Sequence, residues 1–336
     1  MGATRRGSWV SPRLLRFARP VRGLTFGLLL LVLVGPSAPA IFAASTGVSC
    51  AGKLLDTGDS EQAKHGTGTV WRTVRVGDGV RSYLLSRPAT YSTPAPLLVA
   101  FHGLHQRAEC FGAATGLVPA ARAAGVVLAL PESSGPAFND GRLGTTGPDD
   151  DAFALALVHQ LVNARVADAR RVVVVGFSNG AGMAMEVGAT HPGTVAAVVS
   201  IVGSLIDAPD AARPTGSVPA YLVHGDADRV QPWQGRRSAG PLWPAYIPVP
   251  ATVAEWVRVD ESGPPVVEHQ AGGPGRPKIT VSTWSPGPSG AGVTFYAVPG
   301  MGHVWPTKAA DGIDATSLVT RVTATVGGGI SGGSGV

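Results

Sequence analysis

Short runs of consecutive apolar residues recur through the middle of the chain, at the spacing of strands that alternate with helices. A run without polar alternation is typical of a strand that is covered on both faces, as in a parallel sheet. Residues 70–91 differ, because apolar and polar side chains alternate there around Gly77-Asp78-Gly79, which predicts an antiparallel hairpin at a sheet edge. The buried strands are predicted at residues 97–101, 126–130, 172–175, 195–202 and 221–223.

Stretches with helical character separate these strands, and the alternation predicts the α/β class, with a mainly parallel central sheet flanked by helices on both faces. Asp150 and Asp151 suit the positive end of one helix, and Pro192 ends another. Residues 208–250 are rich in proline, glycine and tryptophan, so we expect a long excursion over the edge of the sheet. Helices are predicted at residues 110–124, 151–167, 180–190, 252–259 and 314–326, with further strands at 279–284 and 293–298.

The first 45 residues predict a signal peptide, because basic residues lead into an apolar run at 24–34 and then into small residues. A membrane-anchoring helix is the alternative, but such a helix needs about twenty apolar residues. Pro36 and Pro39 cut this run short. We therefore expect an exported protein without a stable membrane span in its mature form. The catalytic domain is expected over residues 46–326, and a disordered tail of glycine and serine over 327–336.

The basic charge of the chain is concentrated in this leader, which contains six arginines and no acidic residue. Since the formal net charge of the whole chain is +5, the remainder is close to neutral. Nucleic-acid binding depends on clustered lysine and arginine that neutralise phosphates, so no nucleic-acid partner is expected. We expect a monomer.

Only two cysteines occur, Cys50 and Cys110, and by themselves they cannot supply four metal ligands. Neither a metal nor a cofactor is expected. Outside the cytoplasm two cysteines tend to pair, which predicts a disulfide between them. In the alternative interpretation, Val48-Ser49-Cys50 is a lipoprotein processing site and Cys50 is lipid-anchored. Gly47 stands where such a site takes a larger apolar residue, which favours the disulfide.

The candidate nucleophile is Ser178, in the G-x-S-x-G motif Gly176-Phe-Ser-Asn-Gly180. Four valines precede the motif and a helical segment follows it, and this is the setting in which the motif forms a sharp strand-to-helix turn. A Cβ at position 176 or 180 is expected to collide with the neighbouring chain. The structural alternative is a tight turn with a capping serine.

A serine hydroxyl needs a base and a carboxylate to become a good nucleophile, and in this type of fold they follow in the order Ser, Asp, His. His303 is the predicted base, because it stands in a glycine-rich loop after the last strand. Asp228 is favoured as the acid over Asp226, which is expected to cap its own turn. The backbone N–H groups of Leu104 and Asn179 are predicted to form the oxyanion hole.

Together these motifs resemble those of exported polyhydroxybutyrate depolymerases and the related feruloyl and acetylxylan esterases. Gly176-Phe-Ser-Asn-Gly180 is similar to the family's G-x-S-N-G, and Gly302-His-Val-Trp-Pro306 to its G-H-x-W-P. The stretch from His224 to Trp233 resembles H-G-x-x-D-x-x-V-P-Y, which implies that Asp228 is the catalytic aspartate. The similarity covers roughly residues 50–325 and implies an α/β-hydrolase fold and ester hydrolysis.

The departures from the family pattern concern the substrate rather than the chemistry. Gln231 and Trp233 replace the usual Val and Tyr, and Phe138-Asn139-Asp140 stands where relatives often carry a tryptophan. Trp233 and Trp305 are candidates for stacking on an aromatic or sugar group, although packing in the core explains either equally well.

The sequence therefore predicts a secreted serine esterase acting on a small or polymer-attached ester of the feruloyl, acetyl-sugar or hydroxyalkanoate type. Two alternatives stay open: a serine peptidase of the same fold, and a catalytically inactive exported binding protein on a hydrolase scaffold. Reaction with a fluorophosphonate probe separates the enzymes from the inactive scaffold.

Overall fold

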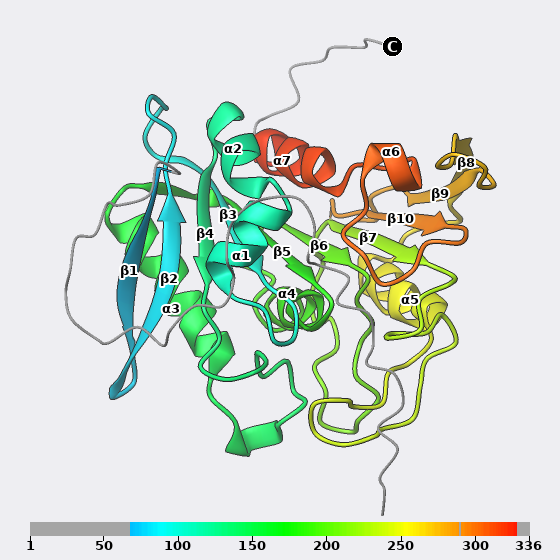
Figure 1. Cartoon of the computed structure of the whole chain (residues 1–336), viewed down its shortest axis with the longest axis horizontal. Helices are drawn as coiled ribbons and strands as arrows, with labels where there is room; N and C mark the ends of the chain where they lie inside the picture. The colour runs from blue at the N-terminus through cyan, green and yellow to red at the C-terminus, as the bar shows by residue number, and fades with distance from the viewer. Residues whose placement is uncertain (1–67, 289, 328–336) are drawn as a thin grey trace, which may run out of the picture. The chain divides into compact units, whose positions relative to one another are not determined.

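The computed structural model describes residues 68–288 and 290–327, and a ten-stranded sheet forms the centre of this part of the chain (Figure 1). The order of strands across the sheet is β1-β2-β4-β3-β5-β6-β7-β10-β9-β8. Pairing is parallel from β4 to β10 and antiparallel at both ends of the sheet. The strands are β1 (Thr69–Val76), β2 (Gly79–Ser86), β3 (Ala95–Phe101), β4 (Val127–Pro131), β5 (Ala167–Phe177), β6 (Ala197–Ile201), β7 (Ala220–Gly225), β8 (Val266–Gln270), β9 (Ile279–Trp284) and β10 (Val293–Val298).

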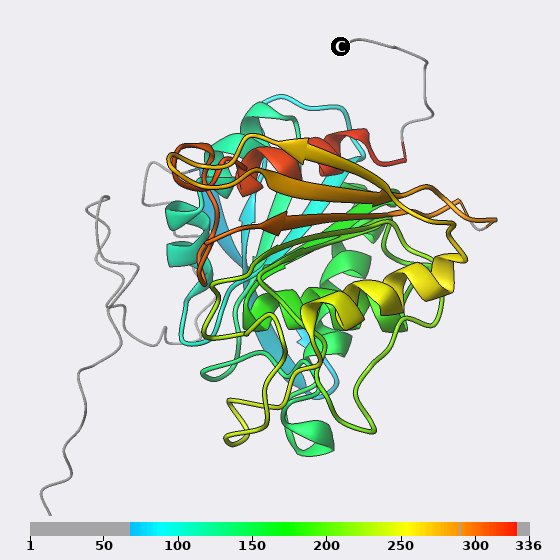
Figure 2. The same ribbon diagram turned by 90° about the vertical axis from the view of Figure 1, so that its right-hand side faces the viewer.

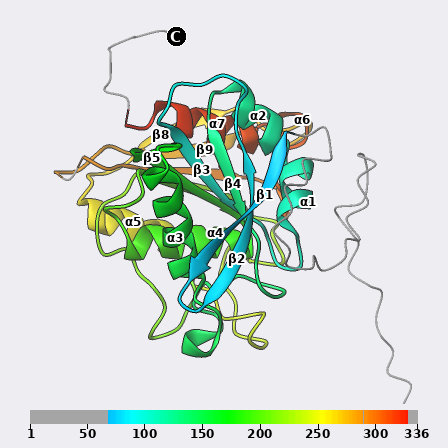
Figure 3. The same ribbon diagram turned by 90° about the vertical axis from the view of Figure 1, so that its left-hand side faces the viewer.

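The central strands are buried because helices cover both faces of the sheet (Figures 2 and 3). Every residue of β3, β4 and β6 is buried. Helices α3, α4 and α5 pack on one face, with Phe153, Met183 and Trp256 in one apolar core, whereas α1, α2 and α7 pack on the other face. The helices are α1 (Ala108–Ala114), α2 (Leu117–Ala123), α3 (Asp150–Asn163), α4 (Asn179–Thr190), α5 (Val249–Asp260), α6 (Lys308–Asp311) and α7 (Ala315–Thr325), with a 3₁₀ turn η1 (Gly144–Thr146).

The architecture confirms the fold class predicted from the sequence, including the hairpin β1–β2 at one edge of the sheet. The segment predicted as one helix over 110–124 is instead two helices, α1 and α2. Gly116 breaks the segment, because its φ of 67° is left-handed and does not continue a right-handed helix.

The expected single excursion over residues 208–250 is also wrong, because β7 lies in the middle of this stretch and in the middle of the sheet. Two loops, 202–219 and 226–248, lie on either side of β7 in the sequence, and a bridge between Ile206 and Tyr246 joins them. Strand β8 and helix α6 carry no clear sequence signal, since all five residues of β8 are exposed and α6 is four residues long.

Several of the predictions from the sequence concern residues outside the part of the chain that the structure describes. The signal peptide over 1–45, the start of the catalytic domain up to residue 67 and nearly all of the tail over 327–336 lie outside the described residues. Cys50 lies there too, so its disulfide with Cys110 stays a prediction. None of the helices in the described part is both long and apolar enough to span a bilayer.

Candidate active site

Ser178 stands at a sharp turn between β5 and α4, where the backbone leaves the sheet and enters the helix. Its φ of 57° and ψ of −116° are unusual for a residue with a side chain, and such angles cluster at functional sites. A Cβ at Gly176 would lie 1.8 Å from the carbonyl oxygen of Gly180, and one at Gly180 would lie 2.1 Å from that of Phe101. The expected collisions at both glycines are therefore confirmed, and the residue types dictate this turn.

The turn is anchored to the next strand of the sheet. The N–H of Ser178 donates to the carbonyl oxygen of Ile201, the last residue of β6, at 3.0 Å. Within the described residues the hydroxyl of Ser178 makes no hydrogen bond, and 7% of the residue is exposed. The hydroxyl is thus held at the carboxyl edge of the parallel strands without a partner that would occupy it.

Asp228 and His303 come from two neighbouring parallel strands, β7 and β10. Both follow the carboxyl end of their strand, so the loops that carry them leave the sheet at the same edge. Nδ1 of His303 and Oδ2 of Asp228 are 2.7 Å apart, a hydrogen-bonding distance. Oδ1 of Asp228 accepts from the N–H groups of Val230 and Gln231, at 2.8 and 2.9 Å. The buried carboxylate is therefore fixed by its own loop and turned towards the imidazole.

The imidazole of His303 lies beside the serine turn. Its ring centroid is 5.2 Å from that of Phe177, the residue directly before Ser178, and 14% of its side chain is exposed. No hydrogen bond joins Ser178 to His303 within the described residues. Catalytic hydrogen bonds are often long in the absence of substrate and shorten in its complex, so this geometry suits a triad at rest.

Two other polar side chains near Asp228 and His303, those of Asp226 and His224, bind other partners. Oδ1 of Asp226 accepts from the N–H of Gly300, at 2.6 Å, so this carboxylate holds the loop that carries His303. His224 is buried, and its Nε2 is 2.9 Å from the carbonyl oxygen of Gln231 and 3.7 Å from Asp228. Burial lowers the pKa of His224, which the nearby Asp228 partly opposes. A neutral His224 donates from Nε2 to Gln231, and its side chain is 1% exposed.

The residues predicted for the oxyanion hole come from the turn after β3 and from the start of α4. Leu104 stands in the turn after β3, and Asn179 is the first residue of α4, where backbone N–H groups lack helical partners. The side chain of Asn179 binds the backbone of Phe138 in both directions, with Oδ1 accepting from its N–H at 2.8 Å and Nδ2 donating to its oxygen at 3.0 Å. This structural task of the asparagine has no signal in the sequence.

The two candidate substrate-contacting tryptophans both make packing contacts. The indole N–H of Trp305 donates to Oγ1 of Thr316 at 2.9 Å, and its ring packs edge-on against Phe111 and Phe177. Trp233 is partly buried against Phe295 and His224. Both residues lie close to the Asp228–His303 pair, and their contact with a substrate stays a prediction.

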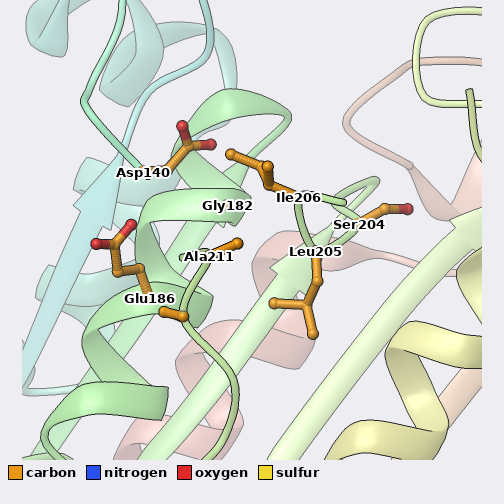
Figure 4. Close-up of a pocket in the computed structure, with 8 residues that line it drawn as sticks. Asp140, Gly182, Glu186, Ser204, Leu205, Ile206 and Ala211 are labelled. Carbon is orange, nitrogen blue, oxygen red and sulfur yellow. The ribbon is translucent and has the colours of Figure 1, made fainter. Parts of the chain in front are cut away.

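A small acidic pocket lies beside the first turns of α4, one turn beyond Ser178 (Figure 4). Asp140 and Glu186 line it, together with Gly182 and apolar residues of the loop after β6. Asp140 forms a buried ion pair with Arg142, whereas Oε2 of Glu186 is buried without a hydrogen-bond partner among the described residues. Burial and the neighbouring Asp140 raise the pKa of Glu186 to about 8. Sequence reasoning missed this cluster, because its members are far apart in the chain.

Comparison with known proteins agrees with the fold. A family model described as phospholipase/carboxylesterase matches residues 151–247. The protein named "Putative esterase NocK", from Nocardia uniformis subsp. tsuyamanensis, is 34% identical over 260 residues, which cover 71% of this chain and 74% of that protein.

Among solved structures, an acetyl xylan esterase from Aspergillus awamori superimposes with a TM-score of 0.54 at 16% identity, covering 75% of this chain and 99% of that one. The poly(3-hydroxybutyrate) depolymerase LpqC of Bordetella parapertussis gives a TM-score of 0.48 at 18% identity, over 76% of this chain and 87% of that one. At such identities the likeness to the first structure concerns the fold alone.

The sheet order, the serine turn and the Asp–His pair define an α/β hydrolase. By its similarity to NocK, the chain belongs to the same family of esterase-type hydrolases, and the phospholipase/carboxylesterase model matches part of it. The similarity to esterases that the motifs predicted is confirmed by NocK, and the acetyl xylan esterase shares the fold.

Proposed function

We propose that this chain is an exported serine esterase that hydrolyses carboxylic esters through a covalent acyl-enzyme on Ser178. The observation that carries the proposal is the hydrogen bond between Asp228 and His303 beside the serine turn. A carboxylate at Nδ1 holds the proton on that nitrogen and leaves Nε2 as the base. Since both oxygens of Asp228 are occupied, the tautomer and the ring orientation are fixed before a substrate arrives.

In the proposed reaction, Nε2 of His303 takes the hydroxyl proton while Ser178 Oγ attacks the ester carbonyl. The carbonyl oxygen gains negative charge, which the N–H groups of Leu104 and Asn179 stabilise; one such donor contributes roughly 3 kcal/mol in other serine hydrolases. The alcohol leaves with the proton from His303. Water then gives a proton to the same nitrogen and attacks the acyl-enzyme, and His303 returns this proton to Ser178 Oγ as the acid is released.

The test is hydrolysis of short p-nitrophenyl esters by the purified protein and by Ser178→Ala. We expect turnover by the wild type, loss of nearly all of it in the variant, and labelling of the wild type alone by a fluorophosphonate probe. Full activity of Ser178→Ala would rule out the mechanism, and absence of labelling would favour an inactive scaffold. Peptide substrates assayed in parallel separate an esterase from a peptidase.

For the substrate we propose an ester of the feruloyl, acetyl-sugar or hydroxyalkanoate type, with Trp233 and Trp305 contributing to its binding. A panel of these three ester classes distinguishes them by kcat/KM. Export of a mature protein without residues 1–45 is part of the proposal. Fractionation of expressing cells and N-terminal sequencing of the product test it, and they also distinguish a lipid-anchored Cys50 from a disulfide.

A further inference from the structure

His102 directly follows β3 and stands two residues before Leu104, yet it plays no part in the mechanism above. Its ring is completely buried. Ser133 N lies 3.3 Å from Nε2 of the ring, and Nδ1 lies 2.9 Å from the carbonyl oxygen of Gly103. A backbone N–H can only donate, so Nε2 accepts and the proton of the neutral ring is on Nδ1. His102 therefore donates a hydrogen bond to the carbonyl oxygen of Gly103.

That carbonyl belongs to the same peptide group as the N–H of Leu104. Within the described residues the only cis peptide bond is Thr93–Pro94, so the bond between Gly103 and Leu104 is trans. In a trans peptide the C=O and the N–H are coplanar and point in opposite directions. Fixing the oxygen of Gly103 therefore fixes the direction of the Leu104 N–H.

The peptide is held at this oxygen by a second donor as well. The N–H of Gln106 donates to the oxygen of Gly103 at 3.1 Å, and Oε1 of Gln106 accepts from the N–H of Gly103 at 2.8 Å. These contacts are local to the turn, whereas His102 ties the turn to Ser133 in the loop after β4. The imidazole therefore connects the turn to the packed interior, as does the hydrogen bond from the N–H of His105 to the oxygen of Pro136 at 2.7 Å.

The imidazole also connects the two predicted oxyanion donors. Its ring centroid is 4.6 Å from that of Phe138, whose backbone is held on both sides by the side chain of Asn179. A continuous buried path thus runs from Asn179 through Phe138 and His102 to the Gly103–Leu104 peptide. Burial lowers the pKa of His102 to about 4, so the ring keeps its neutral form and its acceptor for Ser133 over the ordinary range of pH.

We propose that His102 is a positioning residue of the oxyanion hole, which orients the N–H of Leu104 by donating a hydrogen bond to the carbonyl oxygen of Gly103. The inference rests on the proposed function, because it assigns the Leu104 N–H to a developing oxyanion. It differs from a packing role in one respect: the contribution of His102 is realised in the transition state and hardly at all in substrate binding.

The experiment compares His102→Asn with His102→Gln. The amide nitrogen of asparagine can take the place of Nδ1 and donate to Gly103, whereas the longer glutamine places its amide near Nε2 and cannot. Glutamine is closer to histidine in size. If His102 only fills space, the glutamine variant should therefore be the more active of the two. If His102 positions the Leu104 N–H, the asparagine variant should be the more active. Both proteins are first checked for folding by circular dichroism and thermal unfolding.

For His102→Gln we expect kcat on a p-nitrophenyl ester to fall by roughly 100-fold, the size of one lost oxyanion donor, with KM changed less than about threefold. The affinity for a trifluoromethyl ketone, which forms a tetrahedral oxyanion adduct with the serine, should fall by a similar factor. The His102→Asn variant should retain most of the wild-type kcat and most of the affinity for the ketone.

Equal activity of the two variants, a better glutamine variant, or a loss confined to KM would overturn the inference. So would unfolding of both variants, since His102 would then be needed for the fold as a whole. These outcomes are separate from failure of the proposed function, which the wild type and Ser178→Ala decide on the same substrate.

Discussion

Asp226 and Asp228 are two residues apart in the loop after β7, and their carboxylates bind different parts of the loop that follows β10. Asp226 accepts from the backbone N–H of Gly300, whereas Asp228 accepts from the imidazole of His303. One acid thus holds the loop and the other binds the imidazole. This division allows the two roles to be tested with the same chemical change at neighbouring positions.

Asp228→Asn should lower kcat by roughly 10³–10⁴-fold with little change in KM, because an amide in place of the carboxylate no longer holds the proton on Nδ1 of His303. Steady-state kinetics on a p-nitrophenyl ester measure the effect. Asp226→Asn is the matched control: its amide oxygen can still accept from Gly300, so kcat should stay within a few-fold of wild type. Equal losses in the two variants would contradict the assignment of Asp228.

Gly180→Ala should destabilise the protein and reduce its activity, because the new methyl group would lie 2.1 Å from the oxygen of Phe101 and 2.5 Å from that of His102. Both are backbone atoms that cannot rotate away, and the cost should be about 1–3 kcal/mol or more. Chemical denaturation measures it. Gly193→Ala, where a Cβ meets nothing within 4 Å, should change the free energy of unfolding by less than about 0.5 kcal/mol.

The parts of the fold that the sequence predicted well are those with a strong local cause. Buried strands such as β3 and β6 appear as continuous apolar runs, because both of their faces are covered. The serine turn was predictable for the same kind of reason, since glycines at 176 and 180 are needed by the backbone itself. The exposed edge strand β8 has no such cause, and its sequence carries no alternation that would indicate a strand.

The candidate site follows the same rule. The order and loop context of Ser178, Asp228 and His303 indicated that they would meet, and the structure brings the last two within hydrogen-bonding distance. The side chains that support the site through hydrogen bonds were not predictable, because their partners are distant in the chain. Asn179 binds Phe138, and His102 binds Ser133. Their chemical roles stay predictions until the variants are measured.

Glu186 should make the stability of the protein fall as the pH rises. Burial, together with the nearby Asp140, raises the pKa of its carboxyl from 4.5 to about 8 in the folded state (Figure 4). Between these values the folded chain binds more protons at this site than the unfolded chain does, so the free energy of unfolding decreases through this window and is constant above it.

Replacement by glutamine removes the ionisation, so Glu186→Gln should lose less stability than wild type between about pH 5 and pH 9. Urea denaturation at both pH values measures the difference. Glu255→Gln, at a more exposed glutamate on α5, should follow the wild type. If wild type and Glu186→Gln lose the same stability over this range, Glu186 is ionised in the folded protein at neutral pH.

Arg142 joins its own loop to the loop that carries Leu242 and Tyr246, and its removal should destabilise the protein. Nε and Nη2 donate to both oxygens of Asp140, Nη1 donates to the oxygen of Leu242 at 3.1 Å, and Nη2 lies 3.3 Å from the hydroxyl of Tyr246. Both side chains of the ion pair are 1% exposed. A buried carboxylate that loses its partner costs about 3–5 kcal/mol, so Arg142→Met should lose stability of this order.

The cause of that loss can be separated from the loss of volume. If the unpaired charge of Asp140 causes most of the lost stability, the double variant Arg142→Met, Asp140→Asn should be more stable than Arg142→Met alone. The reason is that the amide carries no charge. Arg258→Met removes an exposed ion pair with Glu255 and should cost less than about 1 kcal/mol. Free energies of unfolding from urea titrations give all four values. A double variant no more stable than Arg142→Met would show that the contacts to Leu242 and Tyr246, rather than the charge, make Arg142 necessary.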